Sequence, residues 1–208
     1  MITALQAQTS TPGLAAALAS VTAVYLLLSV IWLARQHGSY SHVRQTISEL
    51  GEVGSPVAGK AAWFSFAPVG VLCGLSLLAI RPWLPSDENV TAGLLLFGFV
   101  ALGYLLAAVF PCDAGAPLVG SWRNQVHNLI GGFEYLGALG GLDLLHRSLE
   151  DFSQWSQLGL ASQVAFQIVL LGFLGTLWPS PFRGLAQRIG EGAIFGWLAF
   201  AGWSVWIG

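Results

Sequence analysis

The sequence predicts an all-α membrane protein, a six-helix transmembrane bundle with a short interfacial helix between helices one and two. Hydrophobic residues make up 55% of the chain and charged residues only 9%, whereas soluble domains carry roughly 25% charged residues. Six apolar runs also approach the length of about 20 residues with which an α-helix crosses a bilayer. No internal repeat is visible, so residues 1–208 are expected to form a single integral-membrane domain.

The six runs are long enough to cross the bilayer only as helices, because a helix satisfies its own backbone groups inside lipid. They cover residues 14–34, 61–80, 90–110, about 126–145, 158–178 and 189–207. Pro111 closes the third run and Pro179 the fifth. The stretch before the first run has no Lys or Arg. We therefore expect that run to be a span and not a secretory signal, which needs basic residues before its apolar core.

Six spans place both termini on one side of the membrane and the loops after spans one, three and five on the other, which we call the odd face. The odd face holds six basic residues, Arg35, Arg44, Lys60, Arg123, Arg183 and Arg188, and the opposite face holds Arg81 and Arg147. This excess predicts a cytoplasmic odd face. If Arg44, Arg123 and Arg188 are site residues, the count falls to three against two and the orientation stays open.

The charge balance excludes one class of partner. The net charge is −2 and no block of like charges occurs, so a nucleic-acid partner is not expected. The two cysteines, Cys73 and Cys112, provide no disulfide framework. Membrane lipids are the expected partners of a chain with this composition.

The first odd-face loop, "SHVRQTISELG", gathers charge in a chain that has little of it. Its apolar residues recur at helical spacing, at Val43, Ile47 and Leu50. His42 and Glu49 fall on another side of the same helix, and Gly51 stands where a helix stop is expected. The pattern predicts a short amphipathic helix that folds over the end of the bundle. A solvated interfacial helix without a functional role is the alternative.

The fourth span carries a carboxylate inside the apolar run "LIGGFEYLGALGGL". Glu134 and His127 are seven residues apart, so they share one helix face and lie about 10 Å apart along the axis. A carboxylate in a membrane costs a few kcal/mol and faces a partner or a water-filled cavity. We therefore interpret Glu134 as a site residue. The alternative is a structural hydrogen bond or an ion pair with Arg123 or Arg188.

Because topology brings the three odd-face loops to one end of the bundle, their polar residues predict one shared site. The predicted catalytic residues are Glu49, Asp113, His127 and Glu134. The predicted substrate-binding residues are Arg44, Ser48, Arg123, Gln187 and Arg188. A divalent metal such as zinc is a possible cofactor, with His42, Asp113 and His127 as ligands. This set matches no compact signature such as H-E-x-x-H, and without metal a buried Glu can still act as general acid or base.

Four motifs carry a resemblance that covers nearly the whole chain. They are "YSHVRQTISELGEVGSP", "FPCDAGAP", "QVHNLIGGFEYLG" and "GLAQRIGEGAIFGW". These motifs resemble the prokaryotic membrane-protein family catalogued as domain of unknown function nine-nine-eight, which is similar to the Frag/DRAM/Sfk group of six-helix membrane proteins. The resemblance implies the six-helix fold, the bacterial inner (cytoplasmic) membrane, and importance of His42, Ser48, Glu49, Asp113, His127 and Glu134. It implies no reaction.

Two classes of function follow. The first is binding or processing of a lipid or other amphiphile at the polar site, and whether the protein is an enzyme stays open. The second is a non-catalytic accessory subunit that packs against a larger membrane complex, since abundant small residues suit helix–helix docking. A transporter is less favoured, because no pair of broken helices occupies matching halves of the chain.

Overall fold

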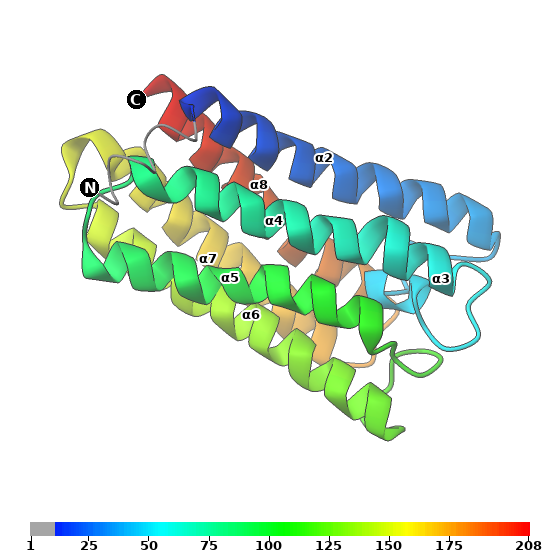
Figure 1. Cartoon of the computed structure of the whole chain (residues 1–208). Helices are drawn as coiled ribbons and strands as arrows, with labels where there is room; N and C mark the ends of the chain where they lie inside the picture. The colour runs from blue at the N-terminus through cyan, green and yellow to red at the C-terminus, as the bar shows by residue number, and fades with distance from the viewer. Residues whose placement is uncertain (1–10) are drawn as a thin grey trace.

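Residues 11–208, the part of the chain that this computed structural model describes, form a bundle of six long helices without a β-strand. Figure 1 shows these helices aligned along most of their length. They are α2 (Pro12–His37), the continuous segment of α3 (Ala58–Ala61), η2 (Ala62–Phe66) and α4 (Ala67–Ile80), α5 (Glu88–Val109), α6 (Trp122–Leu149), α7 (Ser156–Leu177) and α8 (Arg183–Ile207). Short 3₁₀ helices are η1 (Ile47–Leu50), η3 (Arg81–Trp83) and η4 (Ser153–Trp155). The predicted all-α, six-helix bundle is confirmed.

The helices pack in a closed ring in chain order. Each long helix packs against the one before it, and α8 completes the ring by packing along α2. The first turn of α2 also approaches the last turn of α8, where a Cβ on Gly13 would lie 3.7 Å from Nε1 of Trp206. Both described ends of the chain therefore lie at the same end of the bundle, as the even number of spans predicts. Residues 1–10, most of the stretch without Lys or Arg before the first span, lie outside the described residues.

The outer surface of the ring is apolar. Leu78, Leu95 and Leu171 each expose about 70% or more of their surface to the surroundings. Four helical segments are long and apolar enough to cross a membrane, at residues 12–37, 58–83, 88–109 and 153–177. α6 and α8 are the two long helices outside this set. They are more polar because they carry polar residues of the candidate site, such as His127 on α6 and Glu191 on α8.

A π-helical turn precedes Pro68 in the second span. Proline has no N–H, so the carbonyl four residues earlier loses its donor. That carbonyl belongs to Phe64, inside η2, and the hydroxyl of Tyr25 on α2 donates to it at 2.8 Å. A π-turn is a common way to absorb such an interruption. Pro68 thus creates a polar contact between α2 and the second span.

Paired glycines set two of the helix contacts. A Cβ on Gly141 of α6 would lie 2.6 Å from the carbonyl oxygen of Gly93 on α5. A Cβ on Gly172 of α7 would lie 2.7 Å from the backbone of Gly190 on α8. Small residues allow such close backbone approach between membrane helices. These contacts draw α6 and α8 into the ring despite their polar residues.

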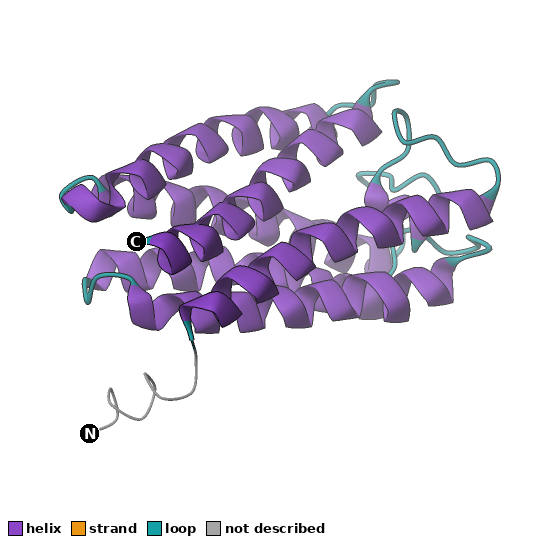
Figure 2. Ribbon diagram, turned by 90° about the horizontal axis from the view of Figure 1, so that it is seen from above, coloured by secondary structure: helices purple, strands orange, loops and turns teal. Residues whose placement is uncertain are grey.

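Three segments close one end of the bundle, which we call the cap: residues 38–57, 110–121 and 178–182. Figure 2 shows these loops together at the end opposite the C-terminus. The first segment lies on the start of α8, where Leu185 N–H donates to the carbonyl of Val43 at 2.9 Å. The loop therefore folds over the bundle end, as predicted.

The predicted interfacial helix is shorter than its apolar pattern indicates. Residues 42–44 form a turn, Thr46 is extended (φ −69°, ψ 159°), and only Ile47–Leu50 form a helix, of the 3₁₀ type. Ile47 and Leu50 are buried but Val43 is 42% exposed, so these three residues do not share one face. The reason is local, because the side chain of Glu49 caps Thr46 and starts a new helix there.

Candidate functional site

Arg183, the first residue of α8, links the second segment of the cap to the end of α7, and its N–H donates to the carbonyl of Ser180 in the third segment at 3.3 Å. Its Nη1 donates to the carbonyl of Ala116 at 2.8 Å, and its Nε donates to the carbonyl of Thr176 at 3.0 Å. Glu52 joins the first and second segments by accepting the N–H of Gly115 at 2.6 Å. Burial raises the pKa of Glu52, while the Gly115 bond opposes that rise. These contacts make the cap one hydrogen-bonded unit.

Two of the predicted catalytic carboxylates belong to the cap's own structure. Glu49 is buried and its Oε2 accepts both the N–H and the hydroxyl of Thr46, at 2.5 and 2.9 Å. Asp113 accepts the N–H and the hydroxyl of Ser121 at 2.6 and 2.7 Å, just before α6. These two hydrogen bonds lower the pKa of Asp113. Both carboxylates thus shape turns.

His127 and Ser48 line a cavity of about 160 Å³ under the cap, together with Arg183 and Gln187. Nδ1 of His127 lies 2.8 Å from the carbonyl of Phe110. A carbonyl can only accept, so Nδ1 carries a proton, and in the neutral ring Nε2 keeps a free lone pair. Gln187 Oε1 accepts the N–H of Ile47 at 2.5 Å. The cavity therefore contains an imidazole whose neutral form can accept a proton at Nε2.

A second, larger cavity runs between α2 and α8, with a volume of about 410 Å³. Its walls are mostly apolar, and His42, Arg188 and Glu191 are its ionisable residues. We call it the α2–α8 groove. The apolar α2 residues that line it extend from Ala23 to Ile31, which is about 12 Å of helix at 1.5 Å per residue. The groove has the shape of an apolar channel with a basic end at the cap.

Arg188 is fixed at that basic end. Its Nη1 donates to the carbonyls of Gln45 and Gly184, at 2.8 and 2.9 Å, and its Nη2 donates to the hydroxyl of Tyr40 at 2.6 Å. Guanidinium has five N–H groups, and two of them have no acceptor among residues 11–208. No carboxylate in the described chain lies within 4.0 Å of Arg188. Arg188 thus presents an unpaired positive charge to the groove.

His42 lies beside Arg188 at the groove mouth. Its ring meets the ring of Tyr40 edge-on, with 5.4 Å between the centroids. Burial and the nearby charge of Arg188 lower the pKa of His42 below its ordinary value. The imidazole is therefore neutral near pH 7, and Arg188 carries the positive charge of this end of the groove.

Glu134 and Glu191 lie close together inside the ring. Each is at most 8% exposed, and the charge of Glu191 acts on Glu134. The hydroxyls of Tyr104 and Tyr135 donate to the two oxygens of Glu191, at 3.0 and 2.9 Å. Glu134 packs on Gly103, where a Cβ would lie 2.3 Å from its Oε2. Neither Glu134 nor Glu191 has an ion-pair partner among the described residues, so the predicted pairing of Glu134 with Arg123 or Arg188 is absent from this part of the chain.

The predicted metal ligands do not form a centre. Residues 11–208 contain no group of three His, Cys, Asp or Glu side chains that could hold a metal ion. His42 borders the groove, Asp113 binds Ser121 at the start of α6, and His127 is bonded to Phe110. The sequence placed all three on the odd face, but their backbone anchors hold them in separate surroundings. Residues 11–208 thus do not bring these three side chains together, and zinc binding by them stays a prediction.

Two predicted substrate-binding residues point away from both cavities. Arg44 is exposed on the cap and borders neither the groove nor the cavity under the cap. Arg123 is exposed, and its guanidinium lies 5.7 Å from the ring centroid of Trp122. The other three, Ser48, Gln187 and Arg188, do border these spaces.

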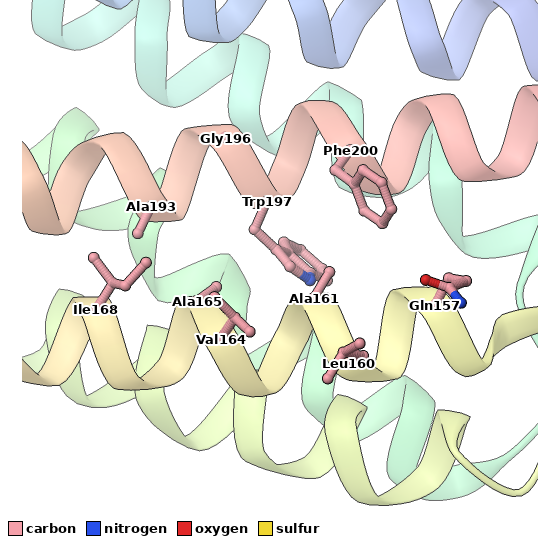
Figure 3. A pocket seen from close by; sticks show the side chains of 10 residues that line it. All are labelled: Gln157, Leu160, Ala161, Val164, Ala165, Ile168, Ala193, Gly196, Trp197 and Phe200. Carbon is pink, nitrogen blue, oxygen red and sulfur yellow. The ribbon is translucent and has the colours of Figure 1, made fainter.

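An apolar groove also opens between α7 and α8. Figure 3 shows its lining side chains, with Ala161 and Ala165 from α7 and Ala193 and Trp197 from α8. Gln157 is its only polar lining side chain apart from the indole of Trp197, whose N–H already donates to Ser162. No charged side chain lines this groove, so nothing in it would orient a headgroup. It differs in this respect from the α2–α8 groove.

Sequence reasoning missed Glu191, Tyr104 and Tyr135 as members of the buried cluster. The sixth apolar run begins at residue 189, so hydropathy alone places Glu191 near the start of a span. The usable signal was a second carboxylate next to small apolar residues in "RIGEGAIFGW". The residues that contact Glu191 come from α5 and α6. They approach it only because the helices pack in a ring, so the spacing of residues along the sequence does not predict these contacts.

Comparison with known proteins agrees with the motif resemblance. A family model described as "Protein of unknown function (DUF998)" matches residues 12–204. No curated protein and no solved structure matches the chain. The matched range covers the ring from the first turn of α2 almost to the end of α8. The chain therefore belongs to the DUF998 family of proteins of unknown function.

Proposed function

We propose that this membrane protein binds an amphiphile with an anionic headgroup in the α2–α8 groove. The headgroup contacts Arg188 at the cap, and the apolar chain lies between α2 and α8. The observation that carries the proposal is the unpaired guanidinium of Arg188 at the end of an apolar groove. A cation without a counter-charge beside lipid is costly, and an anionic headgroup compensates it through charge-assisted hydrogen bonds.

The size and lining of the groove support this ligand class. Its volume of about 410 Å³ falls within the usual range for small-molecule sites of about 300–1,000 Å³. Gly192 and Gly196 have no side chain and leave open space on the α8 wall on either side of Phe195. The bonds from Arg188 to Gln45 and Tyr40 fix its position before a ligand arrives, which lowers the ordering cost of binding.

Binding is better supported than hydrolysis. The carboxylates of Glu49 and Asp113 already accept two hydrogen bonds each within the cap. These bonds hold both carboxylates in turns of the cap, and neither residue lines the groove or the cavity under the cap. His127, which has a free Nε2, lines the other cavity and not the groove.

A direct binding comparison tests the proposal. The purified protein in nanodiscs of neutral lipid is titrated with an alkyl phosphate and with an uncharged alkyl maltoside of the same chain length. We expect the phosphate to bind more tightly, and Arg188→Gln to weaken it by about tenfold to a hundredfold, as for a hydrogen bond to a charged group worth about 1.5–3 kcal/mol. Arg35→Gln, which removes an exposed charge on α2 outside the groove, is the control. Equal binding of both amphiphiles, or equal effects of both variants, would refute the proposal.

A further inference from the structure

The carboxyl pair at the centre of the ring has no cation to neutralise it. Glu134 and Glu191 are 8% and 3% exposed. Among the described residues neither forms an ion pair with Lys, Arg or His. Two ionised carboxylates at close range in apolar surroundings repel each other and lose their hydration. The pair must therefore hold a positive charge from elsewhere.

The hydrogen bonds distinguish the two members. Each oxygen of Glu191 accepts a phenol hydroxyl, from Tyr104 at 3.0 Å and from Tyr135 at 2.9 Å. Donors aimed at a carboxylate stabilise its ionised form. Glu134 has no hydrogen-bond donor among residues 11–208, although it is more than nine-tenths buried and its carboxyl packs on Gly103 beside this cluster. The ionised form of Glu134 thus has nothing to stabilise it.

The neighbours from the other helices add no positive charge. The titratable groups that face the pair are Tyr104 of α5, Tyr135 of α6 and Cys73 of α4, all of them neutral when protonated. Arg188 lies one helical turn before Glu191 on α8, but its guanidinium is directed to the carbonyl of Gln45 and the hydroxyl of Tyr40 in the cap.

We infer that Glu134 and Glu191 form a proton-binding site inside the bundle, in which Glu134 carries the proton and Glu191 is the ionised partner. One proton leaves the pair with a single negative charge, which the two phenol hydroxyls solvate. Glu191 also lines the α2–α8 groove. The proton of the pair therefore exchanges with the surroundings through this groove. The site does not depend on an amphiphile being bound.

Infrared spectroscopy tests the site directly. The full chain is studied in a detergent without carbonyl groups, at mildly alkaline pH, where exposed carboxyls are ionised. We expect one C=O stretching band of a protonated carboxylic acid, which shifts in D₂O because the proton exchanges. Glu134→Gln should remove this band and Glu191→Gln should retain it. Glu52→Gln, which removes the partly buried acid of the cap, should also retain it.

Each outcome decides the inference. If the wild-type protein lacks the band, the inference is wrong. Stabilisation of such a protein against heat by sodium ions would indicate that a sodium ion, and not a proton, neutralises the pair. A band that survives Glu134→Gln, or disappears in Glu191→Gln alone, also overturns the assignment of the proton to Glu134. Size-exclusion chromatography confirms that each variant is folded before its spectrum is used. If Glu134→Gln does not fold, the wild-type and Glu191→Gln spectra still decide.

Discussion

Arg188 and Tyr40 are hydrogen-bonded to each other across the cap. The Nη2 of Arg188 donates to the Tyr40 hydroxyl at 2.6 Å, and that hydroxyl lies 2.6 Å from the carbonyl of Thr46, to which it donates. The guanidinium also lies 5.4 Å from the centroid of the Tyr40 ring. One phenol thus positions both the cation of the groove and the backbone of the first cap loop.

Removal of the Tyr40 hydroxyl should loosen both the side chain of Arg188 and the first cap loop. Tyr40→Phe loses one donated and one accepted hydrogen bond, and we expect it to cost about 1–3 kcal/mol of stability. The loss of a fixed Arg188 should also weaken binding of the alkyl phosphate. Thermal unfolding in detergent and the nanodisc titration measure the two effects. Tyr25→Phe, which removes the hydroxyl bonded to Phe64 on the far side of α2, should affect stability only.

Tyr40 also predicts an alkaline limit for the cap. Burial raises the pKa of Tyr40 to about 12 in the folded protein, above its ordinary value of 10.0. A raised folded-state pKa means that the contribution of Tyr40 is complete below pH 10 and is lost as the pH rises toward 12. Stability measured across this window should fall less in Tyr40→Phe than in the wild type. An identical alkaline fall in both would contradict the prediction.

His42 should make amphiphile binding dependent on pH. Its pKa is lowered by burial and by Arg188, so it is neutral near pH 7 and gains charge only on acidification. A second positive charge beside Arg188 attracts an anionic headgroup, so affinity should rise as the pH falls through the lowered pKa of His42. Without ligand the sign is opposite, because protonation of His42 destabilises the fold at low pH. The measurement uses an alkyl sulfonate, whose charge is constant over this range, and its affinity for His42→Gln should stay flat.

Gly103 should tolerate no side chain. A Cβ there would lie 2.3 Å from Oε2 and 2.8 Å from Cβ of Glu134, so rotation of the carboxyl cannot remove the clash. We expect Gly103→Ala to destabilise the protein by about 1–3 kcal/mol, as overpacking does. Gly98, five residues earlier on α5, has open space around its Cβ position. Gly98→Ala should be neutral or stabilising by up to about 1 kcal/mol, and equal thermal shifts for the two variants would contradict the prediction.

The native cysteines should resist labelling, which makes the orientation measurable. Cys73 and Cys112 are both fully buried, and burial raises the pKa of Cys112 to about 12. Thiol reagents react with the thiolate, so the folded chain should remain unlabelled by a membrane-impermeant maleimide. Val119→Cys places a thiol at an 84% exposed cap position, and its labelling from one side of intact vesicles reports the side that the cap faces. Rapid labelling of the chain without the Val119→Cys change would contradict the burial of its two native cysteines.

Much of the fold can be predicted from the sequence because spans are encoded locally. Each of the six apolar runs coincides with a helix, and the largest shift is at α8, which begins at Arg183 and not at 189. The polar residues before 189 are helical because they contact the cap, as Arg188 does with Gln45. Hydropathy alone registers only the apolar part of such a helix.

The site is less predictable because it depends on packing across the ring. The energetic cost of a carboxylate in lipid correctly predicted that Glu134 is buried. Its nearest acid, Glu191, is 57 residues away in the sequence and is brought close by α8. Glu49 shows why local sequence leaves its role open, since Thr46 at the third residue before it predicts a capping box, and the structure contains that bond.

The contacts of the cap have a consequence for biogenesis. Arg183, Gln187 and Arg188, which bind the first two cap segments, all belong to the start of the last helix. During synthesis the chain emerges from its N-terminal end, so the first five helices enter the membrane before these hydrogen-bond partners exist. Both the groove and the cap stay open until α8 inserts. Completion of the binding site thus coincides with the last insertion step, and a chain arrested before α8 would present unpaired loop backbone to quality-control proteases.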